Sequence, residues 1–180
     1  MDIKWFDADY LPWLILIFPL LSFAIIVLFT SRNQRLSQIV ALAGIGLSWF
    51  FSVCEFIKVV WVLDADLGER VYTSTVDWMT LGASTFKMGV MVDPLTAYML
   101  LMVPLACLLI FIYSLGYMRG DPHNSRFFAY ISLFAGAMLT LVLADNLLML
   151  FIGWEVMGLC SYLLIGFWFH KKSAYQAGVK

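Results

Sequence analysis

The stretch that decides the fold is "MLFIGWEVMGLCSYLLIGFW", which runs from Met149 to Trp168. An α-helix needs about 20 mostly apolar residues to cross about 30 Å of hydrocarbon, and this stretch supplies them. A single acid, Glu155, lies close to its middle. The stretch therefore predicts a transmembrane helix with a carboxyl group deep in the membrane, and such acids are candidates for function.

The composition of the whole chain agrees with a membrane protein. Of its 180 residues, 63% are hydrophobic and 13% are charged, whereas a soluble domain is roughly half apolar and about a quarter charged. The lipid bilayer is therefore its expected surrounding. The net charge is −1 and the sequence holds no basic stripe, which argues against nucleic acid as a partner.

Five segments are long and apolar enough to be membrane helices, and we predict an all-α, polytopic integral membrane protein. The segments are residues 11–30, 38–63, 94–114, 127–144 and 146–169.

The basic residues lie in alternate connections and in the tail. They are Arg32, Arg35, Arg119, Arg126, Lys171 and Lys172. Because such residues favour the cytoplasmic side, or the matrix side in mitochondria, the pattern predicts an N-terminus outside.

The long outer connection has the pattern of a β-hairpin. Residues 70–79 and 86–92 alternate between polar and apolar, and "TLGAST" at 80–85 separates them. This predicts two strands joined by a turn of more than minimal length. We expect the hairpin to pack across the outer ends of the helices.

The starts of the third and fifth helices can be assigned from their first residues. Asp93 and Pro94 suit the N-cap and first position of the third helix, and Asp145-Asn146 offers N-cap chemistry to the fifth. "SAYQAGVK" at 173–180 begins like a sixth helix with Ser173 as N-cap, but no apolar run completes it. We therefore expect a longer protein.

The chain divides into two predicted parts at the start of the third helix. Residues 1–92 form two transmembrane helices and the outer loop with its hairpin. Residues 93–180 are expected to begin the core that carries chemistry, because the helix with the intramembrane acid lies there.

Glu155 is the first candidate site residue. It lies ten residues beyond the preceding turn, about 15 Å below the outer surface. Gly158 and Tyr162 share its helix face and would offer space for a backbone or a water and a polar tip. Gly153 and Cys160 lie on the opposite face, where small residues allow tight helix packing.

Lys180 is the second candidate. Hydrocarbon disfavours the charge on Glu155 and a nearby lysine favours it, so the carboxyl group could gain and lose a proton near neutral pH. Helical rise leaves a depth gap of about 10 Å between the two groups. A relay through water is therefore expected, with a structural protonated acid and a snorkelling interfacial lysine as the alternatives. Glu55 and Lys58 are expected to pair at the outer interface.

Three stretches resemble a known family. They are "FKMGVMVDPLTAYMLLMV", "YSLGYMRGDPHNSRFFAYISLFAGAMLTLVLADNLLMLFIGWEVMGLCSYLLIGFWF" and "SAYQAGVK". They are similar to the largest antiporter-like membrane subunit of proton-pumping NADH:quinone oxidoreductase, called subunit L or chain 5. The resemblance implies that Glu155 matches the midmembrane glutamate of the family's fifth helix. It also implies that Lys180 matches a lysine at the start of the sixth.

The resemblance implies vectorial proton transfer coupled to electron flow from NADH to quinone. NADH, FMN, iron–sulfur clusters and quinone would then be bound by partner subunits, and none by this chain. Other membrane subunits would be its partners, in a bacterial cytoplasmic or mitochondrial inner membrane. Two alternatives stay open: a subunit of a Mrp-type Na⁺/H⁺ antiporter, and a membrane scaffold that transports nothing.

Overall fold

The computed structural model describes residues 10–62, 72–82 and 84–180. Within them, five helices are long and apolar enough to cross a membrane, as the sequence predicted. A two-stranded antiparallel hairpin lies between the second and third. The side on which the N-terminus lies stays a prediction.

The elements follow one another along the chain in the expected order. They are α1 (Leu11–Ile25) with the π-helical turn η1 (Ile26–Thr30), α2 (Gln34–Ile57) with η2 (Lys58–Val62), β1 (Tyr72–Leu81), β2 (Ser84–Val92), α3 (Pro94–Tyr117), α4 (Asn124–Leu143), α5 (Leu147–Ile165) and α6 (Lys172–Val179).

Local chemistry sets where the helices begin. The Asp93 carboxylate accepts a hydrogen bond from Thr96 N at 2.6 Å, and Pro94 opens α3, as predicted. Helix α2 begins at residue 34 rather than 38 because Asn33 caps it and accepts from Leu36 N. Its first turn is polar and therefore lies outside the apolar run from which the start was predicted.

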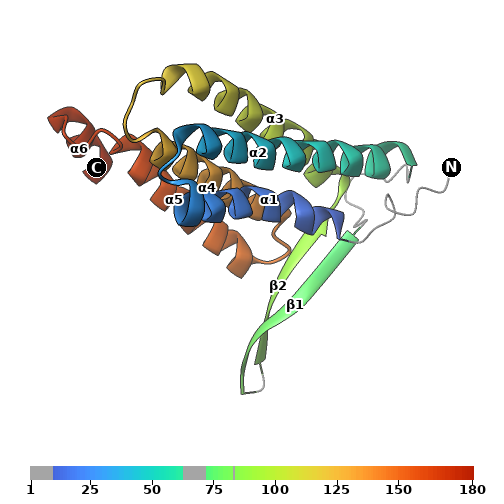
Figure 1. Ribbon diagram of the computed structural model, residues 1–180. Coiled ribbons are helices and arrows are strands. Elements are labelled where there is room, and N and C mark those ends of the chain that lie inside the picture. The colour runs from blue at the N-terminus through green and yellow to red at the C-terminus, as the bar shows by residue number, and fades with distance from the viewer. Residues whose placement is uncertain (1–9, 63–71, 83) are drawn as a thin grey trace.

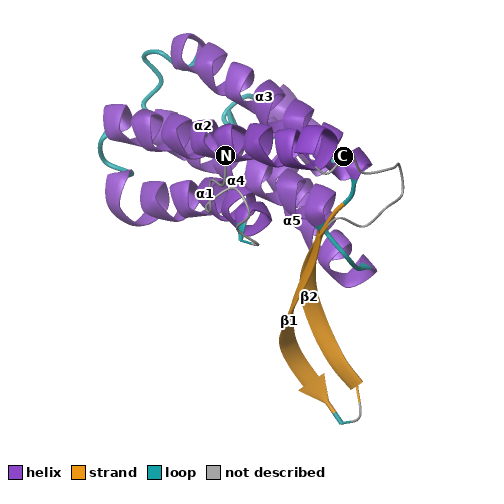
Figure 2. Ribbon diagram, turned by 90° about the vertical axis from the view of Figure 1, so that its right-hand side faces the viewer, coloured by secondary structure: helices purple, strands orange, loops and turns teal. Residues whose placement is uncertain are grey.

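The helices pack around α4, which contacts α1, α2, α3 and α5. Half of the residues in the membrane-spanning part of α4 are buried, whereas only 17% of those in α5 are. The basic residues named above lie at one end of the bundle, here called the basic end. The opposite end, where β2 joins α3, is called the hairpin end (Figures 1 and 2).

Small residues bring α1 and α2 close together. The Ser22 hydroxyl donates to Val40 O at 3.1 Å, and the fully buried Ser48 donates to Ile15 O at 2.7 Å. Gly44 faces Ser22 so closely that an added Cβ would overlap the serine hydroxyl. In lipid no hydrophobic force drives helices together, so close packing and hydrogen bonds between helices of this kind hold them in contact.

The hairpin turn is tighter than predicted. Leu81 pairs with Ser84, so only residues 82 and 83 connect the strands. Gly82 has φ +61, a conformation that glycine adopts without steric cost and that two-residue hairpin turns require. The expectation of a longer turn was wrong because the strand pairing continues into the stretch assigned to the turn.

The hairpin does not lie across the helix ends. Figures 1 and 2 show it projecting away from the helices, and Val76 and Trp78 are more than half exposed. Only its base packs as predicted, where Val90 and Val92 are fully buried. Only the end of β2 next to α3 is therefore buried, and Phe86 near its start is 39% exposed.

The base of the hairpin is tied to the connection between α4 and α5. Asp145 N donates to Gly89 O at 3.2 Å, and Asn146 Nδ2 donates to Lys87 O at 3.0 Å. A side chain at Gly89 would overlap the Asp145 carboxylate. The absence of a side chain there therefore permits this contact.

Gly89→Ala should loosen that contact. The new Cβ would also lie 2.7 Å from Thr75 Cγ2, and overpacking of this kind costs about 1–3 kcal/mol. We expect faster amide hydrogen exchange at Asp145 in the assembled protein, measured by mass spectrometry. Gly116→Ala is the control, because an added Cβ there meets nothing within 4 Å. Equal exchange in both variants would contradict the prediction.

Candidate functional site

Glu155 lies near the middle of a helix that can span the membrane. It follows Leu147 by eight residues and precedes Ile165 by ten, which is about 12 Å and about 15 Å along the axis. The helix begins where Asn146 accepts a hydrogen bond from Met149 N at 2.9 Å, so the predicted cap is present. This cap fixes the register that places the carboxyl group at mid-helix.

The face of α5 that carries Glu155 is open. Glu155 and Gly158 are exposed, and Tyr162 is 51% exposed. An added Cβ at Gly158 would meet nothing within 4 Å. Within the described residues, the Glu155 carboxylate has no hydrogen-bond or ion-pair partner, so this face is free to receive groups from outside them.

The opposite face of α5 is packed tightly, as the sequence predicted. A Cβ built at Gly153 would lie 3.2 Å from Ala137 O and 3.1 Å from Leu141 N. Cys160 on the same face is fully buried. Backbone contact with α4 therefore orients the helix and points Glu155 away from the bundle.

Lys180 lies at the end of the described chain, directly after α6. It follows α6, in which an added Cβ at Gly178 would lie 3.5 Å from Gly166 Cα and 3.7 Å from Tyr162 O. Helix α6 begins at Lys172 without a side-chain cap, so the prediction of a Ser173 cap was wrong. In the described part of the chain, Lys180 and Glu155 form no salt bridge.

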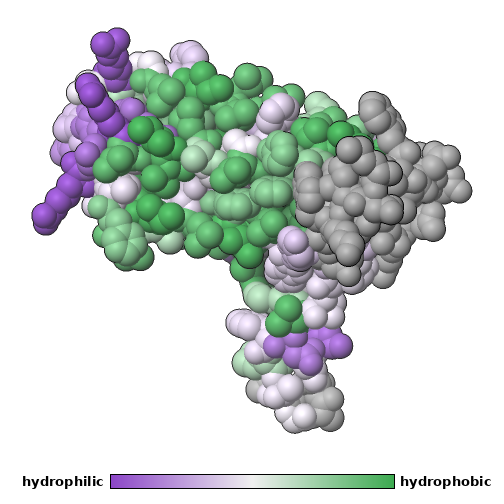
Figure 3. Space-filling view, turned by 45° about the vertical axis from the view of Figure 1, so that its right-hand side comes forward, coloured by the Kyte–Doolittle hydropathy of each residue, from purple (hydrophilic) through white to green (hydrophobic). Residues whose placement is uncertain are grey.

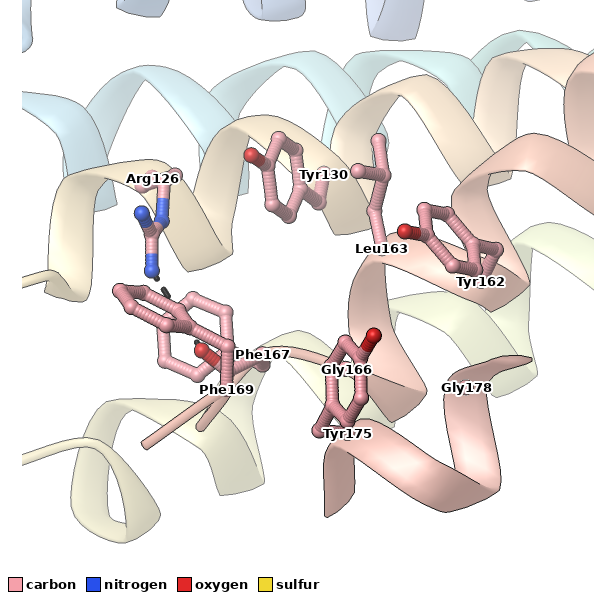
Figure 4. Close-up of a pocket in the computed structure, with 9 residues that line it drawn as sticks. All are labelled: Arg126, Tyr130, Tyr162, Leu163, Gly166, Phe167, Phe169, Tyr175 and Gly178. Atoms are coloured by element: carbon pink, nitrogen blue, oxygen red, sulfur yellow. Dashed lines mark hydrogen bonds between the residues drawn. The ribbon is translucent and has the colours of Figure 1, made fainter. Parts of the chain in front are cut away.

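A cavity of about 140 Å³ lies where α4, α5 and α6 meet at the basic end (Figure 4). The rings of Tyr130, Tyr162 and Tyr175 face it from three different helices. Tyr162 is seven residues, or about 10 Å, beyond Glu155 on the same helix. Of the predicted residues, the structure thus brings Tyr162 to this cavity and leaves Glu155 outside it.

Arg126 forms one wall of the cavity. Its Nη2 donates to Phe167 O at 3.4 Å, shown as a dashed line in Figure 4, and its guanidinium lies 5.0 Å from the Phe167 ring centroid. Sequence analysis missed this cavity, because its residues are spread from 126 to 178 and share no local pattern.

A buried acid was also missed. Glu55 is fully buried, so the expectation that it pairs with Lys58 on an accessible helix surface was wrong. The signal was present in the sequence: Ser48, Ser52 and Glu55 continue at helical spacing the buried stripe that begins at Ser37. Within the described residues, no three His, Cys, Asp or Glu side chains gather closely enough to hold a metal ion.

Asp121 joins the connection before α4 to the end of α5. Trp168 Nε1 donates to Asp121 Oδ2 at 3.0 Å, and His123 N donates to Oδ1 at 2.7 Å. The tryptophan hydrogen bond is the main reason that the pKa of Asp121 lies below its usual value. The contact therefore favours the charged carboxylate.

Trp168→Phe should raise the pKa of Asp121 toward its ordinary value. The contribution of this contact to stability is present at neutral pH and is lost as the pH falls through the lowered pKa of the folded protein. A ¹³C NMR titration of the aspartate carboxyl groups would show the shift, with Asp121→Asn identifying the signal. An unchanged titration in the variant would contradict the assigned cause.

The family model for the chain 5 N-terminus of NADH-ubiquinone oxidoreductase (complex I) matches residues 78–128. A transmembrane model described as NADH:quinone oxidoreductase/Mrp antiporter matches residues 144–180, the region of Glu155 and Lys180.

Three curated relatives match most of the chain. NAD(P)H-quinone oxidoreductase chain 5 of Synechocystis sp. is 38% identical over 174 residues, covering 93% of this chain and 25% of that protein. NADH-quinone oxidoreductase subunit L of Rickettsia typhi is 40% identical over 169 residues, with 93% and 25% covered. F(420)H(2) dehydrogenase subunit L of Methanosarcina mazei is 42% identical over 168 residues, with 93% and 24% covered.

The chain thus spans about a quarter of the length of the curated relatives it matches. Its five membrane-capable helices agree with an integral membrane protein. Together, the two family models and the identities over more than nine tenths of the chain show that it belongs to the subunit L, or chain 5, family.

Proposed function

We propose that this chain is part of a proton-translocating membrane subunit in which Glu155 takes up and releases a proton at mid-membrane. The observation that carries the proposal is the position of the carboxyl group: halfway along a spanning helix, on an open face beside Gly158. An acid at this depth is costly and is kept where it carries protons or binds ions.

The proposed relay runs from Glu155 toward the basic end. Gly158 leaves room for a water against the helix, and Tyr162 supplies a hydroxyl that can donate and accept a hydrogen bond. The cavity around Tyr130 and Tyr175 is large enough for several waters. Lys180 would stabilise the charged carboxylate through this water.

The redox chemistry is proposed to lie on partner subunits. NADH, FMN, iron–sulfur clusters and quinone would be bound there, with this chain binding none of them and contacting other membrane subunits. We place the complex in the bacterial cytoplasmic membrane or the mitochondrial inner membrane. The division between residues 1–92 and 93–180 is proposed as the boundary of the proton-translocating core.

The test is proton pumping by the complete complex in sealed vesicles. On addition of electron donor and quinone, a pH-sensitive dye should report proton movement that an uncoupler abolishes. Replacing Na⁺ by K⁺ should leave the rate unchanged. Proton movement that requires Na⁺ and no electron donor would instead support the Mrp-type antiporter, whose transmembrane domain shares the second family model. Redox activity with this subunit present but no proton movement would support the scaffold.

A further inference from the structure

A second hollow at the basic end lies between the end of α1 and the beginning of α4. It is a groove of about 530 Å³. It is lined by Phe23, Ile26, Val27, Ser31, Pro122, His123, Ser125, Arg126, Ala129 and Tyr130. It shares Arg126 and Tyr130 with the cavity of the proposed relay, but its other lining residues take no part in that relay.

The mouth of the groove holds hydrogen-bond donors that lack partners. Ser125 is 5% exposed, and its Oγ has no hydrogen-bond partner among the described residues. The same is true of Arg126 Nε, although Arg126 Nη2 is bonded to Phe167 O. Buried donors left unsatisfied cost free energy, and both of these residues line the groove, where a ligand could satisfy them.

The position of these donors favours an anion. Ser125 and Arg126 lie in the first turn of α4, a helix of 20 residues, where the helix dipole favours negative charge. The surrounding basic end is rich in Arg and Lys, and Figure 3 shows hydrophilic side chains gathered at one end of a largely apolar surface. The Asp121 carboxylate, in the connection before α4, already accepts bonds from Trp168 and His123.

The remaining walls suit a hydrocarbon chain. Phe23, Ile26, Val27 and Ala129 extend from the mouth along α1, η1 and α4 into the membrane-spanning region. An anion site that continues into an apolar groove at a membrane surface matches one molecule, a phospholipid. Basic pockets between helices on the cytoplasmic or matrix side are known to hold anionic head groups.

We propose that this groove binds an anionic phospholipid, with its phosphate at Ser125 and Arg126 and an acyl chain along Phe23 and Val27. The lipid would join α1 to α4 at the basic end. This proposal does not depend on the proton relay.

The test uses the complete complex in detergent, stripped of lipid and titrated by native mass spectrometry. Phosphatidylglycerol, phosphatidylcholine and inorganic phosphate are the three probes. We expect phosphatidylglycerol to bind most tightly. Arg126→Gln should weaken its binding at least about tenfold, or about 1.4 kcal/mol, because it removes a charge-assisted hydrogen bond. Arg126→Lys should restore part of the loss.

Val27→Trp tests the apolar part of the groove separately. Val27 is 49% exposed, so a larger side chain would fill the groove without entering the core, and we expect phosphatidylglycerol binding to fall. Arg119→Gln is the matched control, because Arg119 is exposed in the same end of the bundle and does not line the groove. If the complex with Arg126→Gln does not assemble, the proposal is tested by phosphatidylglycerol binding in Val27→Trp and Ser125→Ala, which should fall in both.

Three results would overturn the proposal. Binding could be unchanged in both Arg126→Gln and Val27→Trp. Inorganic phosphate could displace the lipid completely at equal concentration, which would identify a free-phosphate site. Finally, Val27→Cys in the assembled complex stripped of lipid could resist a lipid-soluble maleimide, which would show that protein covers the groove.

Discussion

Glu155→Gln should abolish proton translocation in the assembled complex while the subunit still folds and assembles. Glutamine has nearly the same shape but cannot take up and release a proton at mid-membrane. The side chain is exposed and makes no hydrogen bond or ion pair within the described residues, so the change removes no contact there. Proton pumping in vesicles should fall to background, with complex content measured by native gel electrophoresis.

A matched acid on the hairpin controls for loss of charge. Asp77 pairs with Lys87 at 3.8 Å, and its side chain is 67% exposed, so Asp77→Asn should leave pumping unchanged. Glu155→Asp keeps the carboxyl group but moves it by one methylene, and we expect it to retain part of the activity. Normal pumping in Glu155→Gln would disprove the relay. Loss of assembly with normal pumping per remaining complex would indicate a structural acid.

The helices could be predicted because their signals are local. Long apolar runs set the five spans, and Asp93 and Asn146 mark helix starts by chemistry within three residues of themselves. The tight packing at Gly153 was also predictable, because helical periodicity alone separates it from the face of Glu155.

The missed features depend on contacts between distant residues. The burial of Glu55 is the exception, because a stripe of buried residues at helical spacing within α2 indicated it. The cavity at the basic end brings Arg126 together with Gly178. No pattern within one helix predicts that meeting, nor the groove between α1 and α4.

Gly44→Ala should destabilise the subunit, whereas Gly46→Ala should not. The two glycines lie two residues apart in α2. A Cβ at Gly44 would overlap the Ser22 hydroxyl and lie 3.0 Å from Phe18 O, whereas one at Gly46 would meet nothing within 4 Å. Because Phe18 O belongs to the backbone of α1, the helices must separate, which costs about 1–3 kcal/mol. Thermal unfolding of the purified protein would measure the difference.

A second substitution identifies the contact responsible. Ser22→Ala removes the hydroxyl that the new methyl group would meet, at the cost of its bond to Val40 O. If the overlap causes the loss, Gly44→Ala should cost less in the Ser22→Ala background than in the original protein, and the two changes should not be additive. Additive losses would place the origin at Phe18 O and the backbone. Equal stability of Gly44→Ala and Gly46→Ala would show that α1 and α2 approach less closely than their buried serines indicate.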